Sequence, residues 1–178
     1  DVEYALTENL TFGMNYERME AQTDSEHNLD RDATTMELKK GKRLPLVPEN
    51  KGSLWATWST PANMMGAEYK YVRFQASTQG GIITKLEEDS LNSSANPQHR
   101  VPGYAIMDIR AGLQGEDWEV AAYINNLTDE RAQYTWYTGH YGWAMQSTNA
   151  VGKRAHNVDV ATNRPREIGI RYMRRWGE

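Results

Sequence analysis

The stretch Tyr104–Asn125, YAIMDIRAGLQGEDWEVAAYIN, decides the fold. Apolar residues occupy every second position on both sides of the turn-forming tripeptide Gly115-Glu116-Asp117. An alternation of period two is typical of a β-strand with one apolar face, and a short Gly- and Asp-containing break between two such runs is typical of a hairpin. The stretch therefore predicts two antiparallel strands joined by a tight turn.

The same alternation recurs along the rest of the chain, whereas helical periodicity hardly occurs. Seven strands are predicted, near residues 2–6, 10–20, 50–60, 67–79, 103–114, 118–126 and 164–174. Short turns at 7–9, 61–66 and 115–117 alternate with three long connections. The sequence therefore predicts an all-β, antiparallel up-and-down sheet of about seven strands, with its short turns on one rim and its long connections on the other.

Charged residues occupy one face of the predicted strands. Arg73, Asp108, Arg110 and Glu119 alternate with apolar neighbours. Charges buried in the dry core of a sandwich would be costly, whereas a water-filled lumen tolerates them. We therefore expect these four residues to face a barrel lumen, and the apolar set to face lipid. The apolar set is Val72, Phe74, Met107, Ile109, Val120, Ile124, Ile168 and Ile170.

Composition excludes several classes of function. The chain of 178 residues has a net charge of −4, which argues against a nucleic-acid partner. Its lack of cysteine excludes disulfides and cysteine-based zinc sites. The serine-elbow, phosphate-loop and zinc-protease motifs are missing, so we expect neither catalysis nor a cofactor.

The connection between the last two predicted strands is rich in aromatic residues. Its ligand-binding candidates are Trp136, Tyr137, His140, Tyr141 and Trp143, because exposed rings can stack on a chelator or a sugar. The alternative is an extension of the strands whose rings line the membrane interface or pack loop on loop. The four histidines show no metal-ligand spacing, so no metal site is predicted.

Several blocks, taken in order, resemble the C-terminal end of TonB-dependent outer-membrane receptors. They are Leu44–Lys51, Val101–Tyr104, Asp108–Gly112, Trp118–Tyr123, Asn125–Glu130 and Asn163–Tyr172. The Asn/Thr/Asp residues after Ile124 would satisfy backbone groups where strand pairing loosens. Members of that family usually end on an aromatic residue. Trp176 takes that place here, and Arg174 stands where another aromatic is common.

The resemblance implies that residues 1–178 are the C-terminal segment of a 22-stranded transmembrane β-barrel. The signal peptide, the plug domain and the energy-coupling box would lie upstream. It also implies a bacterial outer-membrane receptor that imports a nutrient, most often a ferric siderophore. Its partners would be outer-membrane lipid, the small nutrient, the TonB energy-coupling complex and the barrel-assembly machinery. The alternatives are a soluble all-β carbohydrate-binding module and a passive outer-membrane porin.

Overall fold

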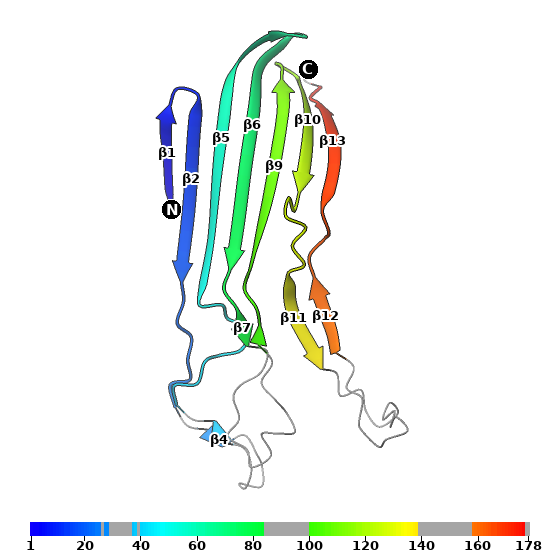
Figure 1. Cartoon of the computed structure of the whole chain (residues 1–178). Helices are drawn as coiled ribbons and strands as arrows, with labels where there is room; N and C mark the ends of the chain where they lie inside the picture. Colours follow the sequence, from blue (N-terminus) through cyan, green and yellow to red (C-terminus); the bar gives the residue numbers. More distant parts are fainter. Residues whose placement is uncertain (26, 29–36, 39, 84–99, 139–157, 177–178) are drawn as a thin grey trace, which may run out of the picture.

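A computed structural model describes residues 1–25, 27–28, 37–38, 40–83, 100–138 and 158–176. Its regular elements are all β-strands (Figure 1). Within these ranges there is no helix long and apolar enough to cross a membrane.

One seven-stranded sheet dominates the structure, in the order β1-β2-β5-β6-β9-β10-β13. Every neighbouring pair is antiparallel. This confirms the all-β, seven-stranded up-and-down sheet expected from the alternation. The strands are β1 (Val2–Thr7), β2 (Leu10–Arg18), β5 (Asn50–Met64), β6 (Ala67–Gln79), β9 (Tyr104–Gln114), β10 (Trp118–Asn125) and β13 (Glu167–Arg174).

The hairpin β5–β6 differs from its predicted form. The expected turn at residues 61–66 is wrong, because β5 continues through Pro61 to Met64. The register of the pair shifts between Pro61 and Met64, and such an irregularity accommodates a proline that has no N–H to donate. The chain reverses at Met65 and Gly66, whose φ values of 56° and 72° match the two left-handed positions of a type I′ hairpin turn. The hairpin therefore extends beyond its neighbours at the short-turn rim (Figure 1).

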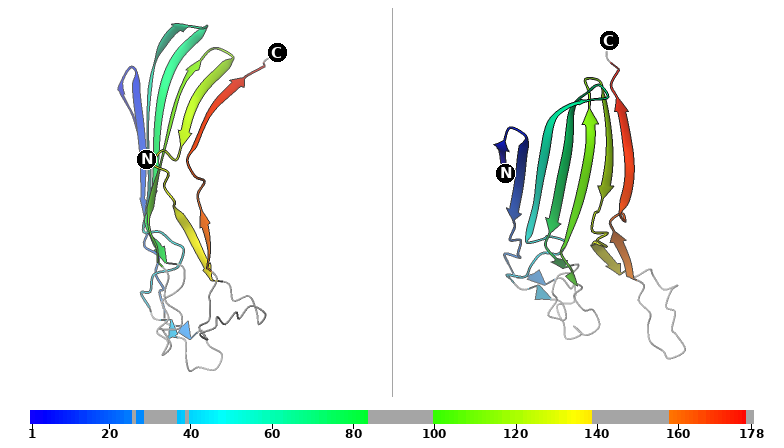
Figure 2. Two further views of the ribbon diagram at one scale, coloured as in Figure 1. Left: turned by 45° about the vertical axis from the view of Figure 1, so that its right-hand side comes forward. Right: turned by 45° about the horizontal axis from the view of Figure 1, so that its top comes forward.

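Within the described residues, the long connections contain six short strands outside the seven expected ones, and of these the sequence predicts only a strand in the region of β11, as the alternative for the aromatic connection. These are β3 (His27–Asn28), β4 (Glu37–Leu38), β7 (Ile82–Ile83), β8 (Arg100–Val101), β11 (Gln133–Thr138) and β12 (Val158–Thr162). They pair as β3–β4, β7–β8 and β11–β12. Strands of two residues carry too little alternation to detect. Figure 2 shows that all three pairs lie at the end of the sheet opposite the short turns.

The large apolar side chains that are buried lie at this long-connection rim, whereas the other buried apolar residues of the sheet are alanines such as Ala121 of β10. Ile82, Ile83, Val101 and Ala132 are all buried, with Val101 only 2% exposed. Arg43 ties a second connection to them, because its Nη2 donates to the Gly81 carbonyl at 2.7 Å. The connection that contains Arg43 is thus tied to the connection that contains β7 and β8.

The sheet is open and curved (Figure 2). Among the described residues, β1 pairs only with β2 and β13 pairs only with β10. Each of these two strands therefore leaves one edge of backbone N–H and C=O groups without a neighbouring strand.

Candidate functional site

The register of the sheet places the four charged residues singled out from the sequence on one face. Arg73 lies directly opposite Arg110, and Asp108 lies opposite Gln75. Glu119 lies opposite Gln114 on β9 and Met173 on β13. Directly opposed residues of an antiparallel pair point to the same side, and alternate residues of one strand do so too. We call this side the polar face; its exposure to a barrel lumen stays a prediction.

Two aromatic rings on the polar face lie over glycines of the adjacent strand. A Cβ atom at Gly13 would come within 2.7 Å of the Trp55 ring, and one at Gly169 within 2.6 Å of the Tyr123 hydroxyl. Each glycine thus leaves room for the ring that faces it. The Trp55 ring in turn lies 5.3 Å from the Arg73 guanidinium carbon, within the range of a cation–π contact.

Two carboxylates near the centre of the polar face, Asp108 and Glu119, already accept hydrogen bonds from neighbouring groups. The Tyr71 hydroxyl donates to Glu119 Oε1. The Asn126 backbone N–H donates to Asp108 Oδ1 at 2.8 Å. These bonds cross from β6 to β10 and from the end of β10 to β9, so they connect strands in addition to the backbone ladder.

Two open hollows lie on the polar face and share the arginine pair. Gln75, Asp108, Tyr123 and Asn125 line the first hollow together with Arg73 and Arg110. The second hollow lies on the other side of the arginine pair, toward the short-turn rim. Its lining includes Tyr71, Gln114 and Glu119. The sequence-based selection missed the uncharged members of this group. Their position on the polar side of the alternation was the signal that could have found them.

A buried asparagine fastens the end of β10. Asn126 is 3% exposed and has a left-handed φ of 54°. Its Nδ2 donates to the carbonyls of Glu130 at 3.0 Å and Arg164 at 3.1 Å, and its Oδ1 accepts from the Glu130 N–H at 2.8 Å. As expected, an asparagine of this motif satisfies backbone groups where the β10–β13 ladder ends.

Asp129 completes the same junction from the other side. Its Oδ1 accepts the Arg166 backbone N–H at 2.9 Å, and Arg131 lies 3.4 Å from its Oδ2. The pKa of Asp129 lies below its ordinary value. The largest cause is the hydrogen bond from the Arg166 N–H, and the positive charges of Arg131 and Arg166 lower the pKa further. We call Asn126 and Asp129 with their partners the β10 junction.

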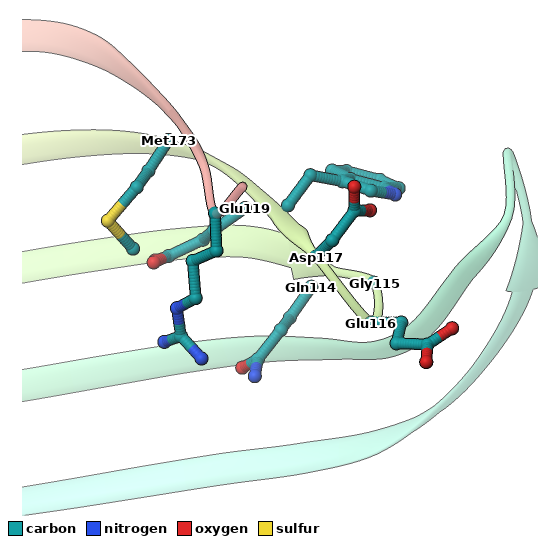
Figure 3. Close-up of a pocket in the computed structure, with 8 residues that line it drawn as sticks. Gln114, Gly115, Glu116, Asp117, Glu119 and Met173 are labelled. Atoms are coloured by element: carbon teal, nitrogen blue, oxygen red, sulfur yellow. The ribbon is translucent and has the colours of Figure 1, made fainter. Parts of the chain in front are cut away.

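A small pocket at the opposite rim marks where the last strand meets the β9–β10 turn (Figure 3). Asp117 Oδ2 accepts from Arg174 Nε at 3.0 Å, and its carbonyl accepts the Arg175 N–H at 2.7 Å. The Arg174 guanidinium carbon lies 4.4 Å from the Trp176 ring. The residues that depart from the family pattern at the C-terminus are thus held against a neighbouring turn by Asp117.

The aromatic ligand candidates fall largely beyond what the structure describes. Trp136 and Tyr137 lie in β11, opposite Val160 and Asp159 of β12, but their side chains are outside the described part. His140, Tyr141 and Trp143 are outside the described residues altogether. Part of this connection is therefore a strand extension, and its role in ligand binding stays a prediction. The described ranges contain no cluster of metal-ligating side chains.

The eight apolar residues singled out from the sequence share the other face of the sheet. Phe74, Ile109, Ile124 and Ile168 form one cross-strand row. Ile168 and Ile170 are 76% and 78% exposed, so no described part of the chain covers this face at those positions. We call it the apolar face.

Comparison with protein-family models matches residues 1–127 to the family described as TonB dependent receptor-like, beta-barrel. The match covers β1 to β10 and contains Arg73, Asp108, Arg110 and Glu119. The aromatic candidates lie beyond it. No curated protein and no solved structure matches the chain.

Proposed function

Because the chain belongs to the family of TonB-dependent receptor-like β-barrels, we propose that it is the C-terminal part of an outer-membrane receptor that imports a ferric siderophore. The family is one of TonB-dependent transporters characteristic of the bacterial outer membrane. The siderophore, as the commonest cargo implied by the family resemblance, is the finer part of the proposal.

The observation that carries this proposal is the contrast between the two faces of one sheet. One face presents a row of isoleucine and phenylalanine side chains with exposed neighbours such as Val72, Ile168 and Ile170, and the other presents arginines and carboxylates. Large exposed apolar patches are unfavourable in water and mark contact with a membrane or a partner. A strand with lipid outside and water inside has this alternation. A soluble carbohydrate-binding sandwich would bury its apolar face against a second sheet.

The two edge strands support the proposal that further strands complete the barrel. A bilayer tolerates no lipid-exposed sheet edge, because each unpaired N–H and C=O would lack a hydrogen-bond partner. In the proposed receptor, upstream strands pair with β1 and β13 to close a barrel of 22 strands. Upstream segments also supply the plug and the region that engages the TonB energy-coupling complex. The barrel-assembly machinery acts on the C-terminal strand that ends near Trp176.

Uptake by intact cells tests this function. A strain that carries the complete receptor should accumulate a radiolabelled ferric siderophore, and deletion of the receptor or of the TonB complex should abolish that accumulation. Uptake that persists without the TonB complex would indicate a passive porin. A purified chain that partitions into buffer rather than detergent would favour the soluble carbohydrate-binding module.

The aromatic connection between β10 and β13 supplies the proposed ligand contacts, namely Trp136, Tyr137, His140, Tyr141 and Trp143. Long connections on one rim of a rigid sheet are where binding residues concentrate. Truncation of a true aromatic anchor costs about 2 kcal/mol or more. The double variant Trp136→Ala/Tyr141→Ala should therefore weaken siderophore binding at least ~30-fold. Met65→Ala, at the opposite rim, is the matched control. Wild-type affinity in the double variant, with normal surface expression, would contradict this assignment.

A further inference from the structure

Arg73 on β6 and Arg110 on β9 are direct cross-strand partners on the polar face. Side chains in such positions have Cβ atoms only about 4.5–5.5 Å apart, and like charges placed directly opposite each other destabilise a sheet. The pairing of two guanidinium groups is therefore unfavourable unless a negative charge lies between or beside them.

The described side chains do not supply this charge by direct contact. Among the described residues, neither arginine forms an ion pair within 4.0 Å. The two nearest carboxylates on the polar face are engaged elsewhere, since Glu119 accepts from Tyr71 and Asp108 accepts from the Asn126 N–H. Arg73 contacts the Trp55 ring, and Arg110 lies beside the Tyr71 hydroxyl.

The surroundings of the pair suit an oxyanion. Both arginines line both hollows of the polar face, so the pair is open to an incoming group. Side-chain amides of Gln75 and Asn125 line the first hollow and offer further N–H donors. Arginine binds planar carboxylates through two parallel hydrogen bonds, which are stronger than neutral ones.

We propose that Arg73 and Arg110 together bind one carboxylate group. It comes either from another segment of the complete receptor or from an anionic solute that enters the barrel. This inference rests on the proposed lumenal position of the polar face. It does not depend on the siderophore, because neither source of the carboxylate is the imported cargo.

A double-mutant cycle on the complete receptor in detergent tests the pair. It measures the coupling between the two arginines, which is the difference between the loss in the double variant and the sum of the two single losses. The variants are Arg73→Gln, Arg110→Gln and the double variant, compared by apparent melting temperature. The cycle cancels contacts that each arginine makes alone, such as that with Trp55. If one carboxylate bridges the pair, each single variant already loses it. The loss of melting temperature in the double variant is then smaller than the sum of the two single losses.

An empty pair gives the opposite sign. Each single variant then relieves the same repulsion, so the double variant loses more than the sum. A loss equal to or larger than the sum, both in sodium chloride and in sodium citrate of equal ionic strength, overturns the proposal. Arg171→Gln serves as the matched control, because Arg171 is on the same face but lies opposite Ala121.

If a glutamine variant fails to assemble, the same cycle is run with Arg73→Lys and Arg110→Lys. These variants keep the charge but lose the bidentate fork, so a bound carboxylate again predicts a double loss smaller than the sum. An equal or larger loss in both salts overturns the proposal.

Repeating the cycle in sodium citrate and in sodium chloride of equal ionic strength distinguishes the two sources of the carboxylate, an anionic solute and another segment of the receptor. A free anion predicts a coupling that appears or grows in citrate, together with a melting temperature that rises in the wild type and not in the double variant. A carboxylate of the receptor itself predicts the same coupling in both salts. Either result supports the site, and an unfavourable or zero coupling in both salts contradicts it. Because unfolding is the readout, this outcome is independent of whether siderophore uptake is observed.

Discussion

Gly13 on β2 is the residue that allows the Trp55 ring to lie flat across the neighbouring strand. A methyl group at this position would approach the ring to 2.7 Å, which no side chain accommodates without a shift. We predict that Gly13→Ala lowers the stability of the complete receptor in detergent by about 1–3 kcal/mol, the usual cost of overpacking. The apparent melting temperature measures this effect.

The cause of that loss is checked in a Trp55→Leu background. With the large ring gone, Gly13→Ala should cost little, because the steric conflict is absent. An equal cost in both backgrounds would mean that the glycine matters for its backbone and not for the space it leaves.

Asp129 gives the β10 junction a dependence on pH. Its pKa is held low in the folded protein by the Arg166 N–H and by nearby positive charge. Because the folded pKa lies below the unfolded value of about 3.9, the carboxylate stabilises the fold above that value, and the stabilisation disappears as pH falls through the folded pKa. We predict that wild type melts higher than Asp129→Asn at pH 6 and that the difference shrinks as pH falls below the unfolded pKa of about 3.9.

Glu116→Gln is the control for this titration, since Glu116 is an exposed turn carboxylate at the opposite rim. It should leave the melting temperature close to that of wild type. A pH-independent difference between wild type and Asp129→Asn would show that the hydrogen bond alone, without the charge, stabilises the junction.

The end of β13 depends on the β9–β10 turn through Asp117. The ion pair with Arg174 is half exposed, and exposed pairs contribute up to about 1 kcal/mol. We predict that Asp117→Ala makes trypsin cleavage after Arg174 and Arg175 about two- to fivefold faster, because the strand end detaches more often. The neighbouring Glu116→Ala should not change the cleavage rate. Equal rates in both variants would exclude the ion pair as the fastening contact.

The strands could be predicted from sequence wherever one face differs from the other along their whole length. Alternation of apolar and polar residues defined β9 and β10 because both sides of those strands meet a constant environment. It failed at Pro61, where a proline that ordinarily ends a strand is absorbed by an irregular register. The contacts of Asn126 could not be derived from local sequence either. They join carbonyls from Glu130 and Arg164, which only the folded sheet brings together.

The molecule as a whole presents two faces with opposite tolerance of charge. Ile109 lies in the middle of β9 on the apolar face, and Ser77 of β6 lies on the polar face opposite Ile106. In the complete receptor folded in lipid, we predict that Ile109→Arg costs about 2–4 kcal/mol, the cost of an arginine near the middle of the bilayer. Ser77→Arg should cost much less. Urea unfolding in vesicles measures both variants, and equal costs would contradict the assignment of the faces.

The alternation of short and long connections also has a consequence for how the chain folds. The turns after β1, β5 and β9 are very short, whereas the connection from Asn125 to Glu167 must bring together segments that are far apart in the sequence. Loop-closure entropy rises by about 0.6 kcal/mol with each doubling of length, and an isolated hairpin forms within about 1–10 μs. We therefore expect the three hairpins β1–β2, β5–β6 and β9–β10 to form before the rest of the sheet. We expect their lateral joining and the pairing of β13 with β10 to follow as the slower steps.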